Sequence, residues 1–248
     1  MYIDIVKEAM AGVKRMTPEI DLNQCSVISC ENKTTLTLDF IEADLPPFEG
    51  EVAFIDSNCI VVKESSDNNL FVLVASHLAT VVPEIGNKVR VKPYFRRNFD
   101  GTRVDGCLLN DGINSDYDCP YTFGESTKLP FNRPEGHYLG FLYDQINRLK
   151  APDGIRNIPQ LLVDANAKDF VVFDQEGEFE LPPRFEFFVS TVKFTGKVTI
   201  LYERVIDLYL IYLWDDDEVI ESRLFTSETI ADLIDDGAWN KIQIDILS

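Results

Sequence analysis

The chain has 248 residues, of which 45% are hydrophobic and 26% are charged. This composition excludes wholesale disorder, and the length suits one large domain or two medium ones. No apolar run approaches the roughly 18 residues that a membrane-spanning helix needs. The amino-terminal stretch carries charges where a signal peptide needs an apolar core, so the sequence predicts a cytoplasmic protein that does not contact membranes.

Acidic residues outnumber basic ones by 42 to 23, which gives a formal net charge of −19. Residues 1–110 hold 16 acidic and 11 basic side chains, whereas residues 111–248 hold 26 and 12. The net charge is therefore −5 in the first stretch and −14 in the second. Such a field repels nucleic acid and membrane surfaces and attracts cationic partners. Acidity that serves solubility alone is the alternative.

The first part of the chain begins with a helical pattern and continues with short strands. Val6, Met10 and Val13 recur at helical spacing, and Thr17-Pro18 ends the pattern. Apolar segments separated by polar turns follow at residues 51–56, 59–64, 70–75 and 88–95. Short strands at this spacing predict a small antiparallel β-barrel-like domain, which with its helix covers residues 1–105.

Residues 106–135 are rich in Gly, Asn, Asp and Pro and lack periodicity, which predicts a linker or long loop between domains. Two helical patterns follow, at 137–150 and 158–167. Strands are expected next at 169–174, 184–192, 197–203, 207–214 and 218–225, then a capped helix at 228–237 and a last strand at 241–247. Residues 136–248 are thus predicted to form an acidic α+β domain, an antiparallel sheet with helices on one face.

Residues 48–95 resemble the KfrB-type domain of plasmid proteins. The shared features are Gly50 before an apolar strand, Asp56 in the following turn and His77-Leu78 after the third strand. A V-P-x-x-G step (Val82, Pro83 and Gly86) then leads into a strand that ends at Tyr94. The family's glutamine-rich stretch and trailing glycine-rich turn are not evident in this chain. The resemblance implies an origin on a plasmid, phage or integrative element, and it implies no chemistry.

One basic segment stands out against the acidic background. Three of its cations fall on one face of a strand, because side chains alternate with a period of two. The candidate nucleic-acid or partner-binding residues are Lys88, Arg90, Lys92, Tyr94, Arg96 and Arg97. Cations interleaved with aromatic rings are typical of a surface on which bases stack. A solvated strand face, a charged edge that prevents aggregation, or pairing with acidic groups are the alternatives.

Acidic residues gather at several places in the second half. The candidate partner-binding residues are Glu176, Glu178, Glu180, Asp215, Asp216, Asp217, Glu218, Glu221, Asp235 and Asp236. In an extended chain the first three would project to one side at about 6.6–6.8 Å intervals. This is about twice the ~3.4 Å spacing of phosphates along one DNA strand. An ordered array of carboxylates can therefore mimic a nucleic-acid backbone, while a charged hairpin turn is the alternative for Asp215–Asp217.

Motifs for catalysis and metal binding are lacking in the sequence. It has two histidines and no nucleophile-elbow, zinc-protease, P-loop or dinucleotide-binding motif. The five cysteines show no C-x-x-C spacing. A calcium-loop pattern that starts at Asn114 has Cys119 where the loop needs glycine. No metal and no cofactor are expected, although an unrecognised enzyme with a carboxylate site stays an alternative.

The sequence therefore predicts a non-enzymatic binding protein encoded by a mobile element. Its predicted role is to inhibit a host defence system that targets nucleic acid, such as CRISPR or restriction. The acidic surface would occupy the cationic groove of a partner protein in that system. The alternative is a plasmid maintenance or transfer factor that binds nucleic acid through residues 88–97.

Overall fold

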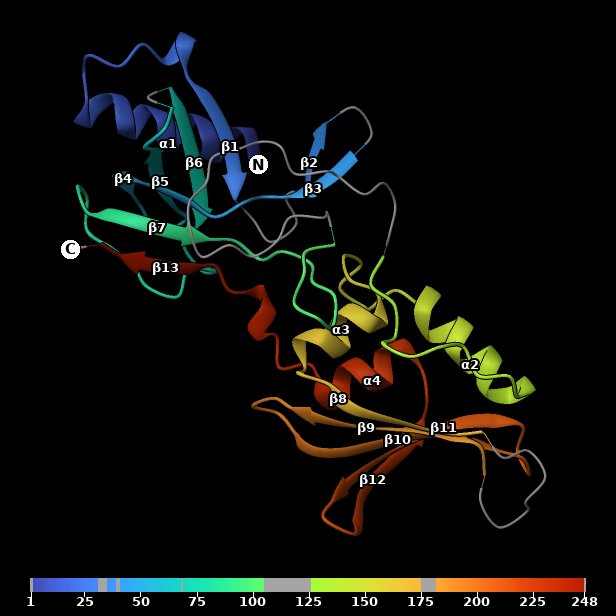
Figure 1. The fold of residues 1–248 in the computed structure, drawn as a ribbon. Helices are drawn as coiled ribbons and strands as arrows, with labels where there is room; N and C mark the ends of the chain where they lie inside the picture. Colours follow the sequence, from blue (N-terminus) through green and yellow to red (C-terminus); the bar gives the residue numbers. More distant parts are fainter. Residues whose placement is uncertain are drawn as a thin grey trace. The chain divides into compact units, whose positions relative to one another are not determined.

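The computed structural model describes residues 2–30, 35–38, 41–67, 69–104, 126–174 and 182–247. These residues divide into two compact units, which are considered separately (Figure 1). The first unit takes the described residues up to Phe95 and those from Trp239 onward, and the second takes those from Arg96 to Ala238. Among the described residues, the chain thus passes through the second unit and returns to the first for its last strand.

The first unit is built on a six-stranded sheet with the strand order β1-β6-β5-β4-β7-β13. Neighbouring strands are antiparallel except β1 and β6, which are parallel. The strands are β1 (Ser26–Cys30), β4 (Phe48–Ile55), β5 (Cys59–Glu64), β6 (Leu70–Ala75), β7 (Lys88–Lys92) and β13 (Gln243–Ile246). A separate hairpin pairs β2 (Thr35–Leu38) with β3 (Ile41–Asp44). Since no pairing between described strands joins β1 to β13, barrel-like closure stays a prediction.

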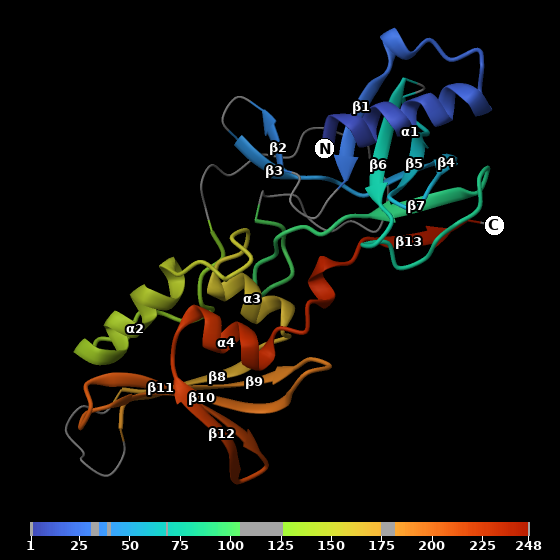
Figure 2. The ribbon, with the colours of Figure 1, turned by 180° about the vertical axis from the view of Figure 1, so that it is seen from behind.

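Helix α1 (Tyr2–Met16) packs on one face of this sheet, as Figure 2 shows from behind. A short 3-10 helix, η1 (Leu22–Gln24), follows it. One buried cluster joins the helix to alternate residues of β5 and β6, namely Ala9, Met10, Val13, Cys59, Val61, Phe71 and Leu73. The intervening residues form a second cluster on the opposite face, among them Ile60, Val62, Val72 and Val74. The continuous apolar runs of β5 and β6 thus reflect burial on both faces.

Three residues that carry the KfrB-type resemblance have structural roles in this unit. A Cβ at Gly50 would lie 2.3 Å from the carbonyl oxygen of Lys63, so only glycine fits this close approach of β4 to β5. The carboxylate of Asp56 accepts the backbone N–H groups of Asn58 (2.7 Å) and Cys59 (2.8 Å) in the turn between these strands. Gly86 has a φ of +87°, which glycine adopts readily.

The second unit is a five-stranded antiparallel meander with the order β12-β11-β10-β9-β8. Its strands are β8 (Lys168–Phe173), β9 (Arg184–Ser190), β10 (Thr195–Glu203), β11 (Leu208–Asp215) and β12 (Glu218–Leu224). Its helices are α2 (His137–Arg148), α3 (Ile158–Asp164) and α4 (Ser227–Ile234). All three helices lie on the same side of the sheet in both views (Figures 1 and 2). The other face of the sheet carries no described helix.

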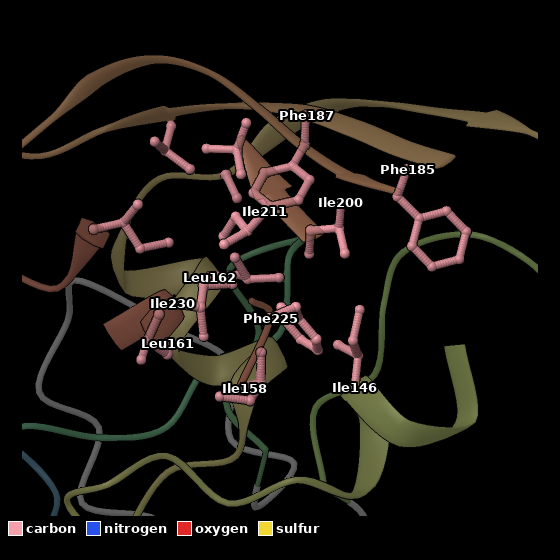
Figure 3. Close-up of a cluster of buried hydrophobic side chains, with 14 of the residues drawn as sticks. Ile146, Ile158, Leu161, Leu162, Phe185, Phe187, Ile200, Ile211, Phe225 and Ile230 are labelled. Carbon is pink, nitrogen blue, oxygen red and sulfur yellow. The ribbon is translucent and has the colours of Figure 1, made fainter. Parts of the chain in front are cut away.

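The core of the second unit fills the space between the sheet and the helices (Figure 3). Alternate strand residues point toward the helices, including Phe185, Phe187, Val198, Ile200 and Ile211. The helices contribute Leu139, Leu142, Ile146, Ile158, Leu161, Leu162, Ile230 and Leu233. Helix α3 begins with a capping box, in which Asn157 and Gln160 each accept the other's backbone N–H.

The predicted α+β class is confirmed, with two sheets that are mainly antiparallel. The last strand was expected in the second half, and that assignment is wrong. After the 3-10 helix η2 (Ala238–Asn240), β13 pairs with β7 of the first sheet. The alternation of Ile242 and Ile244 with polar residues indicates a half-buried strand, but it does not indicate which sheet offers an edge.

Candidate protein interface

Four consecutive acidic residues form the tip of the β11–β12 hairpin. Asp215 ends β11 and lies opposite Glu218, which begins β12, so Asp216 and Asp217 form a two-residue turn. Asp216 has a φ of 50°, a backbone conformation that glycine and asparagine usually supply in such turns. All four side chains are exposed. The predicted hairpin turn at this position is therefore present.

The hairpin tip carries charge that does not favour its own folding. Like charges directly opposite each other on neighbouring strands destabilise a hairpin, and Asp215 and Glu218 are such a pair. Among the described residues, no ion pair joins any of the four carboxylates to a basic side chain. Turns favour Asp and Asp216 has a positive φ, so the turn accounts for Asp216, but it requires no charge at Asp215, Asp217 or Glu218. The four carboxylates instead present their charge to the surroundings.

The helix-free side of the second sheet, here called the open face, adjoins this tip. The strand register places five side chains in one row across the sheet: Val219, Trp214, Lys197, Phe188 and Lys168. Cations and rings alternate along the row. The ammonium group of Lys197 lies 4.6 Å from the centre of the Trp214 ring, and that of Lys168 lies 5.8 Å from the centre of the Phe188 ring. These distances are those of cation–π contacts.

Two further rows complete the open face. The middle row contains Ser222, Tyr212, Thr199, Glu186 and Val171, and the third contains Leu224, Leu210, Leu201, Arg184 and Phe173. The guanidinium of Arg184 lies 3.8 Å from the centre of the Phe173 ring and is paired with Glu186 at 2.6 Å. Val171 and Leu224 are about half exposed. The open face thus combines aromatic rings, aliphatic groups and cations beside an acidic tip.

Other predicted acidic residues are engaged within the protein. Glu221 is ion-paired with Arg223, which also contacts Asp232 at 2.6 Å. Asp235 contacts the buried Arg156 and accepts the backbone N–H of Gly237. Asp236 accepts the backbone N–H groups of Val192 and Ala238, both at 2.9 Å. Glu176, Glu178 and Glu180 lie outside the described residues. Of the described members of the predicted set, Asp215, Asp216, Asp217 and Glu218 form the one cluster at an exposed site.

The sequence did not reveal a charged network in the interior of the second unit. The side chain of Arg156 is fully buried, and its nitrogens contact Asp153 (2.9 Å), Asp164 (2.9 Å) and Asp235. Burial alone would raise the pKa of Asp153, but hydrogen bonds from the N–H groups of Arg156 and Ile155, with the guanidinium and its charge, hold that pKa below its ordinary value. In the sequence, the Pro-Asp-Gly turn before Arg156 was the one local feature that marked the position of this network.

The basic segment is split between the units and paired with acidic neighbours. Lys88, Arg90 and Lys92 belong to β7, which lies between β4 and β13. Arg90 is ion-paired with Glu49 on β4 (2.7 Å) and Lys92 with Asp245 on β13 (3.0 Å). Hydrogen bonds from Gln243 and Lys92 accordingly lower the pKa of Asp245. Of the three strand cations, only the exposed Lys88 has no ion pair among the described residues, although Glu51 lies opposite it.

The rest of the segment is also engaged. The ring of Tyr94 packs edge-on against Trp239, with 5.2 Å between ring centres. Arg97 lies in the second unit and contacts Asp164 at 3.5 Å, and Arg96 also lies in that unit. Four of these six residues thus belong to the first unit and two to the second.

Among the described residues, no group of three or more His, Cys, Asp and Glu side chains is placed to hold a metal ion. None of the described helices is long and apolar enough to cross a membrane. Comparison with protein-family models, curated proteins and solved structures found no match to this chain. The KfrB-type resemblance therefore stays a prediction.

Proposed function

We propose that this chain is a non-enzymatic binding protein whose acidic β11–β12 hairpin occupies a cationic surface of a partner protein. The observation that carries the proposal is the four-carboxylate tip, which is exposed and holds like charges opposite each other. The surrounding chain reinforces it, because residues 203–236 contain 11 acidic and 2 basic side chains. Such a field steers a cationic partner toward the hairpin and repels an anionic one.

The open face supplies the other part of such an interface. Binding energy in protein interfaces is concentrated in a few aromatic and arginine side chains near the centre, with charged residues around them. Trp214 and Tyr212 lie on the open face with 6.4 Å between ring centres, and Trp214 directly precedes the acidic tip. An aromatic anchor beside a charged rim matches this arrangement.

The finer proposal concerns the class of partner. Proteins that bind DNA or RNA present cationic grooves to the phosphate backbone, so carboxylates in a compact cluster can compete for the same groove. The proposed partner is a nucleic-acid-processing defence complex, such as a CRISPR effector or a restriction enzyme, and the proposed source is a mobile element. Direct nucleic-acid binding through residues 88–97 is the less favoured proposal, since Arg90 and Lys92 already have acidic partners.

Reversal of the tip charge tests the proposal. We expect replacement of Asp215, Asp216, Asp217 and Glu218 by lysine to slow association with a captured CRISPR effector or restriction enzyme by about ten-fold or more at low salt. Added salt should reproduce part of this loss on the unaltered protein, because it screens exposed charges. Surface plasmon resonance over a range of salt concentrations measures both effects, and competition against DNA shows whether the groove is shared.

A second quadruple variant controls for net charge. Glu8, Glu19, Glu84 and Glu135 are exposed and distant in sequence from the hairpin, and their replacement by lysine changes the net charge equally. If both variants slow association to the same extent, the recognition is a property of total charge and not of the hairpin. If neither does, or if the captured partner has no nucleic-acid groove, mimicry is wrong.

The cross-strand pair predicts opposite effects on stability and binding. Asp215→Lys converts a like-charge pair with Glu218 into an attractive one, so the free energy of unfolding should rise by about 0.2–1 kcal/mol. The same variant should bind a cationic partner more weakly. Asp217→Lys makes the same charge change in the turn, without a residue opposite it, and should weaken binding with less gain in stability. Urea denaturation and binding titrations on both variants check this, and a loss of stability in Asp215→Lys would contradict it.

A further inference from the structure

Strand β12 lies at the edge of the second sheet, and six of its seven residues are exposed. It pairs with β11 on one side, and no described strand pairs with its other side. Three of its side chains are large, apolar and exposed: Val219 (45%), Ile220 (55%) and Leu224 (50%). Proteins usually protect such an edge, because its unpaired backbone groups can pair with another chain. An edge strand of seven residues that exposes three apolar side chains beside its charged ones is therefore a candidate docking strand.

The hydrogen-bond pattern shows which backbone groups this edge offers. The N–H of Phe225 donates to the carbonyl oxygen of Tyr209 at 2.9 Å. In an antiparallel pair, hydrogen-bonded and non-hydrogen-bonded residue pairs alternate. Arg223 is therefore bonded to β11, whereas the N–H and C=O groups of Ser222 and Leu224 point away from it. These two residues therefore present backbone N–H donors and C=O acceptors two positions apart, the spacing at which an added strand would form hydrogen bonds.

The acidic tip decides which occupant suits this edge. Asp215, Asp216, Asp217 and Glu218 lead directly into β12, so a strand added along β12 passes beside four carboxylates. A second copy of this chain would bring another strongly acidic surface to the same place, since residues 111–248 carry a net charge of −14. A basic extended segment gains attraction from the tip and apolar contacts from Val219 and Leu224.

We propose that β12 binds a basic extended segment of the partner protein, which joins the sheet as an additional edge strand. Backbone hydrogen bonds to Ser222 and Leu224 would supply affinity, and lysine or arginine side chains near the tip would supply specificity, as in other cases of strand addition. This inference rests on the proposed function, because it uses the same hairpin, and it adds the form in which the partner binds.

A proline at position 222 tests the inference directly. Ser222→Pro removes the N–H that points to the incoming strand and leaves the bonds to β11 intact, and edge strands tolerate proline in this orientation. The probe is a fluorescently labelled peptide that alternates lysine and valine. We expect Ser222→Pro to weaken peptide binding at least ten-fold, measured by fluorescence anisotropy, while Ser222→Ala, which keeps the N–H, stays within about two-fold. The thermal midpoint of Ser222→Pro should stay close to that of Ser222→Ala.

Hydrogen exchange on the unaltered protein gives an independent readout if the proline variant does not fold. The amides of Ser222 and Leu224 should become protected when the peptide is added. Equal binding by Ser222→Pro and Ser222→Ala, or no protection of these amides, would overturn strand addition. Loss of peptide binding in the tip-reversal variant alone would retain the acidic hairpin as a binding site and reject β12. Concentration-dependent dimerisation that Ser222→Pro abolishes would show that the occupant is a second copy, which also overturns the proposal.

Discussion

Replacement of Arg156 by methionine should destabilise the second unit by about 3–5 kcal/mol, because it removes the buried guanidinium that pairs with three carboxylates, even though Arg97 stays 3.5 Å from one of them, Asp164. The guanidinium contacts Asp153, Asp164 and Asp235, and the side chain of Asp164 is 8% exposed. Arg223→Met is the matched control, since Arg223 also contacts two carboxylates but is largely exposed. Exposed ion pairs contribute about 1 kcal/mol or less. Similar losses in the two variants would contradict a structural role for the buried network.

The two tryptophans make this measurement specific. Trp214 belongs to the second unit and Trp239 to the first, so each reports on one unit when the other is replaced by phenylalanine. Urea denaturation of Arg156→Met in a Trp239→Phe background should show a large shift of the Trp214 transition. The Trp239 transition, followed in a Trp214→Phe background, should move much less.

The same network predicts how stability depends on pH. The pKa of Asp153 in the folded protein lies below its ordinary value, so its contribution is present above the unfolded pKa and is lost as the pH falls through the folded pKa. The unaltered second unit should therefore lose stability in acid. Arg156→Met should show a smaller loss or a gain in the same range, because protonation removes the unpaired charges. Denaturation midpoints of both proteins between about pH 3 and pH 7 distinguish these outcomes.

Local patterns in the sequence predicted the elements well, because each depends on neighbouring residues. The spacing of Val6, Met10 and Val13 predicted α1, and the segments 59–64 and 70–75 coincide with β5 and β6. The acidic turn between two apolar strands predicted the hairpin tip at Asp216–Asp217. The helix follows from its side-chain period, the two strands from short apolar runs bounded by polar turns, and the tip from the preference of turns for Asp.

Pairings between distant segments could not be predicted in this way. The parallel pairing of β1 with β6 and the return of β13 to β7 depend on which sheet edges remain unpaired after the other strands fold. The Arg156 network could not be predicted for the same reason, since Asp235 is 79 residues further along the chain than Arg156. The rows of the open face likewise required the register of four strand pairs. The contacts of Asp235, Asp236 and Glu221 with neighbouring groups likewise could not be predicted from the sequence.

Ile244→Ala in the last strand should destabilise the first unit by about 2–5 kcal/mol, as deletion of a buried isoleucine side chain does. Ile244 is 3% exposed and lies opposite Val91 of β7, although 152 positions separate the two residues in the chain. Its loss leaves a cavity in the cluster that also contains Ile60, Val62 and Val89. Ile246→Ala is the matched control, because Ile246 belongs to the same strand but is 52% exposed. Its effect should be about 0.5 kcal/mol or less.

The tryptophan signals again decide which unit depends on β13. With Trp214 replaced by phenylalanine, the transition reported by Trp239 should shift strongly for Ile244→Ala and little for Ile246→Ala. With Trp239 replaced instead, the transition reported by Trp214 should change little in either variant. If Ile244→Ala shifts the Trp214 transition as much as the Trp239 transition, the last strand stabilises the second unit as well. A shift confined to the transition reported by Trp239 means that β13 stabilises the first unit only, although β13 follows the second unit in the sequence.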